Sequence, residues 1–251
     1  MVKGLFFDAG NTLIDMDYAF VCSVIEKEAC PADPAVLRIA DYHVRFAMDR
    51  ELLRRIAAGE EIPSGAISLK ATPLLRSYFS RLLRGVDVAE ASQERIIDRI
   101  LEEEAVDEYG LWRMVRPELE LALAELVRRK YVLAVISNSD GRLARRLSLL
   151  GIKKYFVFVL DSADVGMEKP DPRLFRRALE MCGIEAAESI YVGDLCSVDV
   201  LAARRVGMQG ILYDPGDLYG GIEPRRIVSW SDLFCILDGQ SLSNPAVALD
   251  A

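Results

Sequence analysis

The sequence is short of several residue types, and each shortage excludes a class of protein. Its single histidine, His43, makes a histidine-based metal site or a Ser–His catalytic pair an unfavourable interpretation. Lysine and arginine total 31 against 39 aspartates and glutamates, a net charge of −8, so we expect no nucleic-acid partner held by broad positive charge. An acidic protein that binds an anion needs a local device, such as a metal ion, a lysine or backbone amides.

Paired cysteines and long apolar runs are also missing. The five cysteines are odd in number and show no metal-binding spacing, which is typical of reduced thiols in a cytoplasm. No apolar run approaches the length that spans a bilayer, and the short apolar segment at the N-terminus reaches Asp8 without a small-residue cleavage site. We therefore expect a cytoplasmic protein that has no membrane partner and acts as a monomer or homodimer.

What the sequence does contain is an alternation of strands and helices. Its 51% hydrophobic and 28% charged residues are ordinary for a globular protein, and 251 residues allow an α/β core with an inserted second domain. Apolar runs alternate with helical periodicity and predict strands at residues 5–7, 131–136, 155–160, 189–192, 210–213 and 227–228. This pattern predicts an α/β fold with a mainly parallel, Rossmann-like sheet and helices on both faces.

A long helical segment separates the first strand from the others. Apolar residues such as Val36, Ala40 and Val44 recur there at helical spacing, and prolines and glycines divide the segment into four or so helices. We therefore predict a Rossmann-like core of residues 1–16 and 112–251, interrupted by a helical cap of residues 17–111. The chain would cross between the two at residues 15–18 and 111–116.

Four chemically active side chains follow predicted strands. Asp8, Ser137 and Asp194 stand at or just past the ends of three strands, and Lys169 lies in a loop after a fourth. The carboxyl ends of parallel strands meet at one crevice of an open α/β sheet. Two carboxylates, a hydroxyl and a lysine in this order describe a phosphoryl-transfer site.

The chain resembles the haloacid dehalogenase superfamily, in the branch with a helical cap inserted after the first strand. The stretches that carry the resemblance are FFDAGNTL, VISNSDG, VGMEKPDPRLF and IYVGDLCSVDVLAA. They span nearly the whole core, whereas the cap matches only in its position and helical character.

The resemblance implies a role for each residue of the site. Asp8 would be the nucleophile that forms an aspartyl-phosphate, with Lys169 and Ser137 holding phosphoryl oxygens. Mg²⁺ would be the cofactor, bound by Asp8, the carbonyl of Gly10 and Asp194. Asp199 would belong to the metal site, where it holds a metal-bound water or the lysine. The phosphate or substrate would be bound by Ala9, Asn11, Thr12 and Asn138.

Each of these residues has a simpler interpretation. Ser137 alone is typical of a hydroxyl that caps a turn, Lys169 of a solvated loop charge, and Asp199 of a first-turn helix acid. Asp194 is harder to explain in that way, because an unpaired acid at a buried strand end costs free energy.

One position departs from the family pattern. Most phosphatases of this family carry a second aspartate, the general acid–base, two residues after the nucleophile, and here that position is Gly10. Either the substrate has a good leaving group, as in acyl or anomeric phosphates, or another acid replaces it, or the site hydrolyses phosphate slowly or only binds it. Possible replacements are Asp15, Asp17, Asp140 and a residue of the cap.

The sequence thus predicts a Mg²⁺-dependent phosphohydrolase acting on a small phosphorylated metabolite. The first alternative is a 2-haloacid dehalogenase, since those enzymes also lack the second aspartate; they need no Mg²⁺, however, and lack the paired acids of the last motif. The second is a weakly active phosphate-binding or scaffold protein. His43 and the cap arginines are candidate substrate contacts: Arg45, Arg50, Arg54, Arg55, Arg76, Arg81 and Arg84.

Overall fold

The computed structural model describes residues 1–60, 72–220 and 225–240. Residues 61–71 of the predicted cap lie outside the described residues. Residues 221–224 and 241–251 of the predicted core lie outside them as well. Among the described residues no helix has the length and apolar character needed to cross a membrane.

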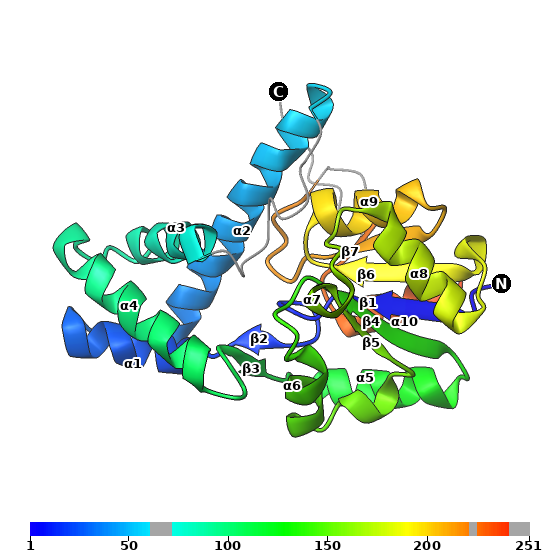
Figure 1. Ribbon diagram of the computed structural model, residues 1–251, viewed down its shortest axis with the longest axis horizontal. Coiled ribbons are helices and arrows are strands. Elements are labelled where there is room, and N and C mark those ends of the chain that lie inside the picture. Colours follow the sequence, from blue (N-terminus) through cyan, green and yellow to red (C-terminus); the bar gives the residue numbers. More distant parts are fainter. Residues whose placement is uncertain (61–71, 221–224, 241–251) are drawn as a thin grey trace.

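The core is a six-stranded parallel sheet with β1 at its centre (Figure 1). The strands lie in the order β5-β4-β1-β6-β7-β8, and β1 pairs with β4 on one side and with β6 on the other. Their bounds are β1 Gly4–Phe7, β4 Val132–Ser137, β5 Val159–Asp161, β6 Ser189–Gly193, β7 Gln209–Tyr213 and β8 Arg226–Ile227. The predicted parallel α/β sheet is confirmed.

Helices cover both faces of this sheet. Successive side chains of β1 point to opposite faces, so they pack into two different cores. Leu5 and Phe7 belong to a core shared with α5 (Pro117–Arg128), α6 (Leu143–Leu149) and α10 (Trp230–Leu237). Phe6 instead packs in a core with α8 (Pro172–Cys182) and α9 (Leu201–Arg205). All three strand residues are fully buried, which explains why the strand reads as one continuous apolar run.

Between the short strands β2 and β3 the described chain forms four helices, which we call the four-helix segment. They are α1 (Tyr18–Glu28), α2 (Pro34–Ala57), α3 (Thr72–Arg84) and α4 (Glu90–Val106). Figure 1 shows α1, α3 and α4 to one side of the sheet, with α2 rising between α3 and the sheet towards the top of the view. The two crossings between this segment and the core pair as antiparallel strands, β2 (Asp15–Met16) and β3 (Trp112–Met114).

The structure differs from the sequence prediction in five elements. The strand predicted at residues 155–160 is shorter, because Lys153–Tyr155 form a 3₁₀ turn and β5 covers only Val159–Asp161. The last strand begins one residue earlier than predicted, at Arg226. The helix after β6 begins with a π-helical turn, η3 (Cys196–Val200), and two short helices were not predicted, α7 (Ser162–Val165) and α10.

Candidate active site

Asp8 lies at the carboxyl end of the central strand, directly after β1. Its carboxylate oxygen Oδ1 accepts hydrogen bonds from Lys169 Nζ at 2.5 Å and from Ser137 Oγ at 3.0 Å. Among the described residues no hydrogen bond is made to the second oxygen, Oδ2. Two donors therefore orient the carboxylate through Oδ1 and leave Oδ2 uncommitted within the described chain. The structure brings Asp8, Ser137 and Lys169 together as the sequence predicted.

Lys169 is the cation at the centre of this group. Its side chain is 3% exposed and contacts two carboxylates, Asp8 at 2.5 Å and Asp199 at 2.6 Å. Burial favours the neutral amine, but the charges of Asp199 and Asp8 outweigh it and raise the pKa of Lys169. The lysine is therefore a permanent positive charge at neutral pH.

Asp199 holds the lysine from the opposite side. Oδ1 accepts from Lys169, and Oδ2 accepts from the backbone amide of Leu195 at 3.0 Å. The carboxylate fits only because residue 193 is glycine: a Cβ atom on Gly193 would lie 2.5 Å from the Asp199 carboxyl carbon. Asp199 is thus a fixed partner of Lys169.

Asp194 is paired with a residue of the four-helix segment. Arg45 of α2 donates from Nη1 to Asp194 Oδ2 at 2.6 Å and from Nε to Asp41 at 3.0 Å. Burial raises the pKa of Asp194 to about 8, with Arg45 opposing the shift and Asp8 and Asp199 adding to it. Burial likewise raises the pKa of Asp8, against the attraction of Lys169. The residues of the site therefore do not by themselves supply enough positive charge to keep both carboxyl groups at their usual pKa.

This donor set fits a divalent cation. When ionised, Asp8, Asp194 and Asp199 would carry three negative charges against the two positive charges of Lys169 and Arg45, and all five residues are buried or nearly so. No three His, Cys, Asp or Glu side chains of the described residues stand close enough to hold a metal by themselves. Two carboxylates and a backbone carbonyl, completed by water and substrate oxygens, match the hard-oxygen sphere that Mg²⁺ prefers.

The loop after Asp8 presents backbone rather than charged side chains. Ala9, Gly10 and Asn11 line the cavity described below, whereas Thr12 does not. Asn11 adopts φ +58°, a conformation that asparagine tolerates better than other non-glycine residues. Its Oδ1 accepts a hydrogen bond from Trp112 Nε1 at 3.0 Å, and this ties the loop to β3. The Thr12 hydroxyl is buried and has no partner within the described chain.

Asn138 lines the same cavity, but its side chain is engaged by Lys169. Its Nδ2 donates to the Lys169 carbonyl at 3.0 Å, and its Oδ1 accepts from the Lys169 amide at 2.7 Å. The asparagine therefore orients the lysine loop, and both ends of its amide are occupied.

A cavity of about 530 Å³ opens over Asp8 between the core and the four-helix segment. Polar groups from the strand ends form one part of its wall, and apolar side chains of α2, α3, α4 and β3 form another. Those apolar side chains are Met48, Leu75, Tyr78, Leu101, Ala105 and Trp112. Its volume is within the range typical of sites that enclose a drug-sized ligand.

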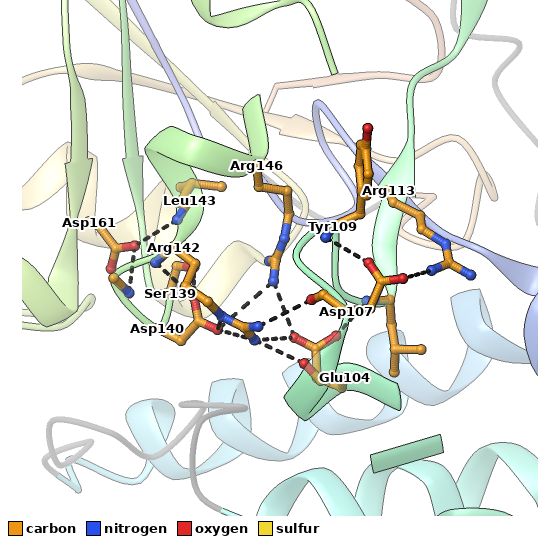
Figure 2. Close-up of polar contacts among 12 residues, drawn as sticks. Glu104, Asp107, Tyr109, Arg113, Ser139, Asp140, Arg142, Leu143, Arg146 and Asp161 are labelled. Carbon is orange, nitrogen blue, oxygen red and sulfur yellow. Dashed lines mark hydrogen bonds and ion pairs between the residues drawn. The ribbon is translucent and has the colours of Figure 1, made fainter. Parts of the chain in front are cut away.

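A cluster of charged residues lines the cavity near α6 (Figure 2). Figure 2 shows the guanidinium groups of Arg142 and Arg146 converging on Glu104 of α4, each 3.2 Å from its carboxylate. Arg142 also donates from Nε to Asp140 at 2.6 Å. The two arginines are thus already paired with carboxylates.

The three aspartates named as replacement acids are all held in ion pairs. Asp15 accepts from Arg116 at 2.5 Å and Asp17 from Arg113 at 2.9 Å, and neither lines the cavity. Asp140 does line it. Burial acts to raise the pKa of Asp140, but hydrogen bonds from Arg142 outweigh burial and hold the pKa below its usual value. An ionised Asp140 is poorly suited to donate a proton to a leaving group.

Of the arginines proposed as substrate contacts, Arg45 alone lines the described cavity. His43 is exposed on α2 and does not line it. The structure adds two residues that the sequence did not indicate. Asp49 of α2 is buried and bonds the backbone after Asp194, and Trp112 covers Gly10. Asp49 follows Arg45 by one helical turn, but no sequence signal connects either position to the last motif.

A family model of haloacid dehalogenase-like hydrolases matches residues 2–207. A phosphoserine phosphatase of Thermus thermophilus is 43% identical over 101 residues, which are 40% of this chain and 41% of that protein. The chain thus matches about two fifths of this relative's length.

Solved structures of the same fold match almost the whole chain. A HAD hydrolase of Bacillus subtilis bound to magnesium has a TM-score of 0.61 at 19% identity, with 94% of this chain and 99% of that chain covered. A 2-haloacid dehalogenase of Pseudomonas syringae pv. tomato has a TM-score of 0.54 at 26% identity, with 95% and 99% covered.

Proposed function

The chain belongs to the haloacid dehalogenase-like hydrolases, and we propose that it is a Mg²⁺-dependent phosphohydrolase that acts on a small phosphorylated metabolite through an aspartyl-phosphate. The observation that carries this proposal is the asymmetry of the Asp8 carboxylate. Oδ1 is held by Lys169 and Ser137, and Oδ2 is left without a hydrogen bond among the described residues. A nucleophile needs such an oriented, uncommitted oxygen.

In the proposed reaction Asp8 Oδ2 attacks phosphorus and forms a new O–P bond. The bond from phosphorus to the leaving oxygen breaks, and its electron pair departs with that oxygen. Lys169 and Ser137 stabilise charge on the phosphoryl oxygens, as do the amides of the Ala9–Asn11 loop. Water then hydrolyses the aspartyl-phosphate, which releases phosphate and restores Asp8.

We propose that Asp8, the Gly10 carbonyl and Asp194 hold the cation, and that Asp199 acts through Lys169. When bound, Mg²⁺ supplies the positive charge that a phosphate dianion needs beside three carboxylates. Arg45, which pairs with Asp194, would lie beside the bound cation.

We further propose that the four-helix segment is the cap, with residues 17–111 closing over a core of residues 1–16 and 112–251. The paired crossings β2 and β3 support these boundaries, because they end and begin at Met16 and Trp112. Closure over the cavity would exclude water from the reacting phosphate.

Glycine at position 10 and the similarity to a 2-haloacid dehalogenase favour a second function, hydrolysis of 2-haloacids. The charge of the site argues against it. A haloacid brings its own carboxylate to a site in which Asp8, Asp194 and Asp199 already outnumber the two paired cations.

The two functions separate in one experiment. Purified protein is assayed with a panel of phosphate esters, acetyl phosphate and sugar 1-phosphates, and with 2-haloacids, each in Mg²⁺ and in EDTA. We expect phosphate release that depends on Mg²⁺ and no halide release. Halide release that persists in EDTA, with no phosphate release, would establish the dehalogenase. Binding of a phosphate analogue without turnover of any substrate would establish the phosphate-binding protein.

A further inference from the structure

We propose that the leaving group of the substrate is an uncharged aromatic ring that packs against Trp112 above Gly10, so that the protein prefers aryl phosphate monoesters to phosphorylated acids. This inference rests on the proposed phosphohydrolase function and names its substrate class. Three observations carry it: the position of the indole, the apolar wall that continues from it, and the pairing of every cation in the described wall.

The indole of Trp112 lies where an acidic side chain at position 10 would extend. A Cβ atom built on Gly10 would be 3.8 Å from Trp112 Cδ1 and 3.9 Å from Nε1, which is ordinary van der Waals contact. Trp112 is 8% exposed, lines the cavity, and has its indole fixed by the hydrogen bond to Asn11. Beside the nucleophile loop, where a general acid would stand, the protein thus presents an aromatic surface.

Apolar side chains continue this wall away from Asp8. Met48 of α2, Leu75 of α3 and Leu101 of α4 line the same cavity as Trp112. An aromatic ring placed among them gains the free energy of apolar burial and favourable ring–indole geometry. A short, highly charged leaving group would leave these side chains in contact with water.

Each cation of the cavity wall already pairs with at least one carboxylate, although Arg146 Nε is buried without a hydrogen-bond partner in the described chain. Lys169 pairs with Asp8 and Asp199, and Arg45 pairs with Asp41 and Asp194. Arg142 and Arg146 converge on Glu104. The described wall also contributes Asp49 and Asp140, so its six acids outnumber its four cations. A second anionic group on the substrate would therefore meet cations that each already pair with a carboxylate, in a wall with more acids than cations.

The absence of an acidic side chain at position 10 also favours aryl phosphate monoesters as substrates. Without a proton donor at position 10, the leaving oxygen must depart as an anion. A phenolate does so far more readily than an alkoxide, since a phenol has a pKa of about 10. In the proposed step the aryl C–O bond stays intact, the P–O bond breaks, and the phenolate takes its proton from solvent water afterwards.

Binding measurements test the preference for an aromatic ring independently of catalysis. The affinities of two non-hydrolysable analogues, benzylphosphonate and phosphonoacetate, are measured by calorimetry at fixed free Mg²⁺. We expect benzylphosphonate to bind at least about tenfold more tightly, the factor that burial of one aromatic ring supplies at the low end of its range. Equal or tighter binding of phosphonoacetate, or no binding of benzylphosphonate, would overturn the inference.

Two variants, each with a matched control, test whether this apolar wall causes the preference for benzylphosphonate. Trp112→Ala should remove most of the benzylphosphonate advantage, whereas Trp112→Phe, which keeps an aromatic ring, should retain it and shows that the fold is intact. Met48→Lys places a free cation in the wall and should shift the preference towards phosphonoacetate. Met181→Lys makes the same change on exposed α8, outside the cavity, and should leave both affinities unchanged. Unchanged selectivity in Trp112→Ala and Met48→Lys would contradict the proposal.

Turnover then separates the leaving-group argument from the proposed function. Phenyl phosphate should exceed benzyl phosphate in kcat by about 100-fold or more, because benzyl phosphate has the ring but a poor leaving group. Equal rates would refute the missing-acid argument. If neither ester is hydrolysed while benzylphosphonate still binds more tightly, the phosphohydrolase function fails and the ring preference stands.

Discussion

Asp49 on helix α2 accepts hydrogen bonds from both the backbone amide, at 3.0 Å, and the hydroxyl of Ser197. The same carboxylate accepts from the Cys196 amide at 2.9 Å and from the Tyr219 hydroxyl at 2.8 Å. The four-helix segment is therefore fastened to the turn that directly follows Asp194. Through Asp49, the position of α2 and the geometry of the candidate metal site are linked.

Asp49→Asn should loosen this attachment. An amide in place of the carboxylate turns one acceptor into a donor and leaves a buried N–H group without a partner, which costs about 1–3 kcal/mol. We expect a lower free energy of unfolding in urea and weaker Mg²⁺ binding by calorimetry. Asp238→Asn is the control, because Asp238 is a half-exposed partner of Arg129 and its loss should change stability little. Wild-type Mg²⁺ affinity in Asp49→Asn would contradict the link.

Gly193→Ala should disrupt the site through one methyl group. The new Cβ would lie 2.5–2.6 Å from the Asp199 side chain, so the carboxylate that holds Lys169 has to move. We expect kcat for a phosphate substrate to fall by at least about tenfold, the scale expected when overpacking of about 1–3 kcal/mol falls on a positioning group. Gly220→Ala is a matched control, because its Cβ would approach no atom of the described residues closer than 4.0 Å. Equal rates for the two variants would show that Asp199 does not position the lysine.

Gly10→Asp should supply the missing proton donor. General acid–base catalysis contributes about 10²–10⁴-fold, so kcat for an alkyl phosphate should rise, and kcat for phenyl phosphate should change much less. The added Cβ fits at 3.8 Å from Trp112, but the carboxyl group must share space with the indole, which limits the gain. Gly10→Asn has the same shape without an acid and should show no gain. A similar rise in both variants would indicate a steric cause.

Lys169→Met should leave buried carboxylates without their shared cation. Removing one partner of a buried ion pair costs about 3–5 kcal/mol, and here Asp8 and Asp199 both lose their lysine. We expect a large fall in Tm without metal and partial recovery in Mg²⁺, together with loss of phosphatase activity. Lys154→Met breaks an exposed pair with Glu120 and should leave both Tm and activity close to wild type. A Tm independent of Mg²⁺ would argue against a cation beside Asp8.

The sequence determined the parallel sheet and the residues that stand at its carboxyl edge. Strands such as Leu5–Phe7 are buried on both faces, so they appear as apolar runs, and the residues that follow them are fixed by chain order. Because β1 lies between β4 and β6, Asp8, Ser137 and Asp194 meet at one edge. Local pattern and sheet topology are sufficient for this part of the site.

Only the tertiary structure decided which residues of the four-helix segment reach that edge. Arg45 and Asp194 are 149 residues apart, and Trp112 and Asn11 are 101 apart. Such contacts depend on how α2 and β3 pack against the core, and a helical periodicity that indicates a buried face does not say what the face is packed against. Gly10 is therefore readable from the sequence as a missing acid, whereas the indole that covers it follows from packing alone.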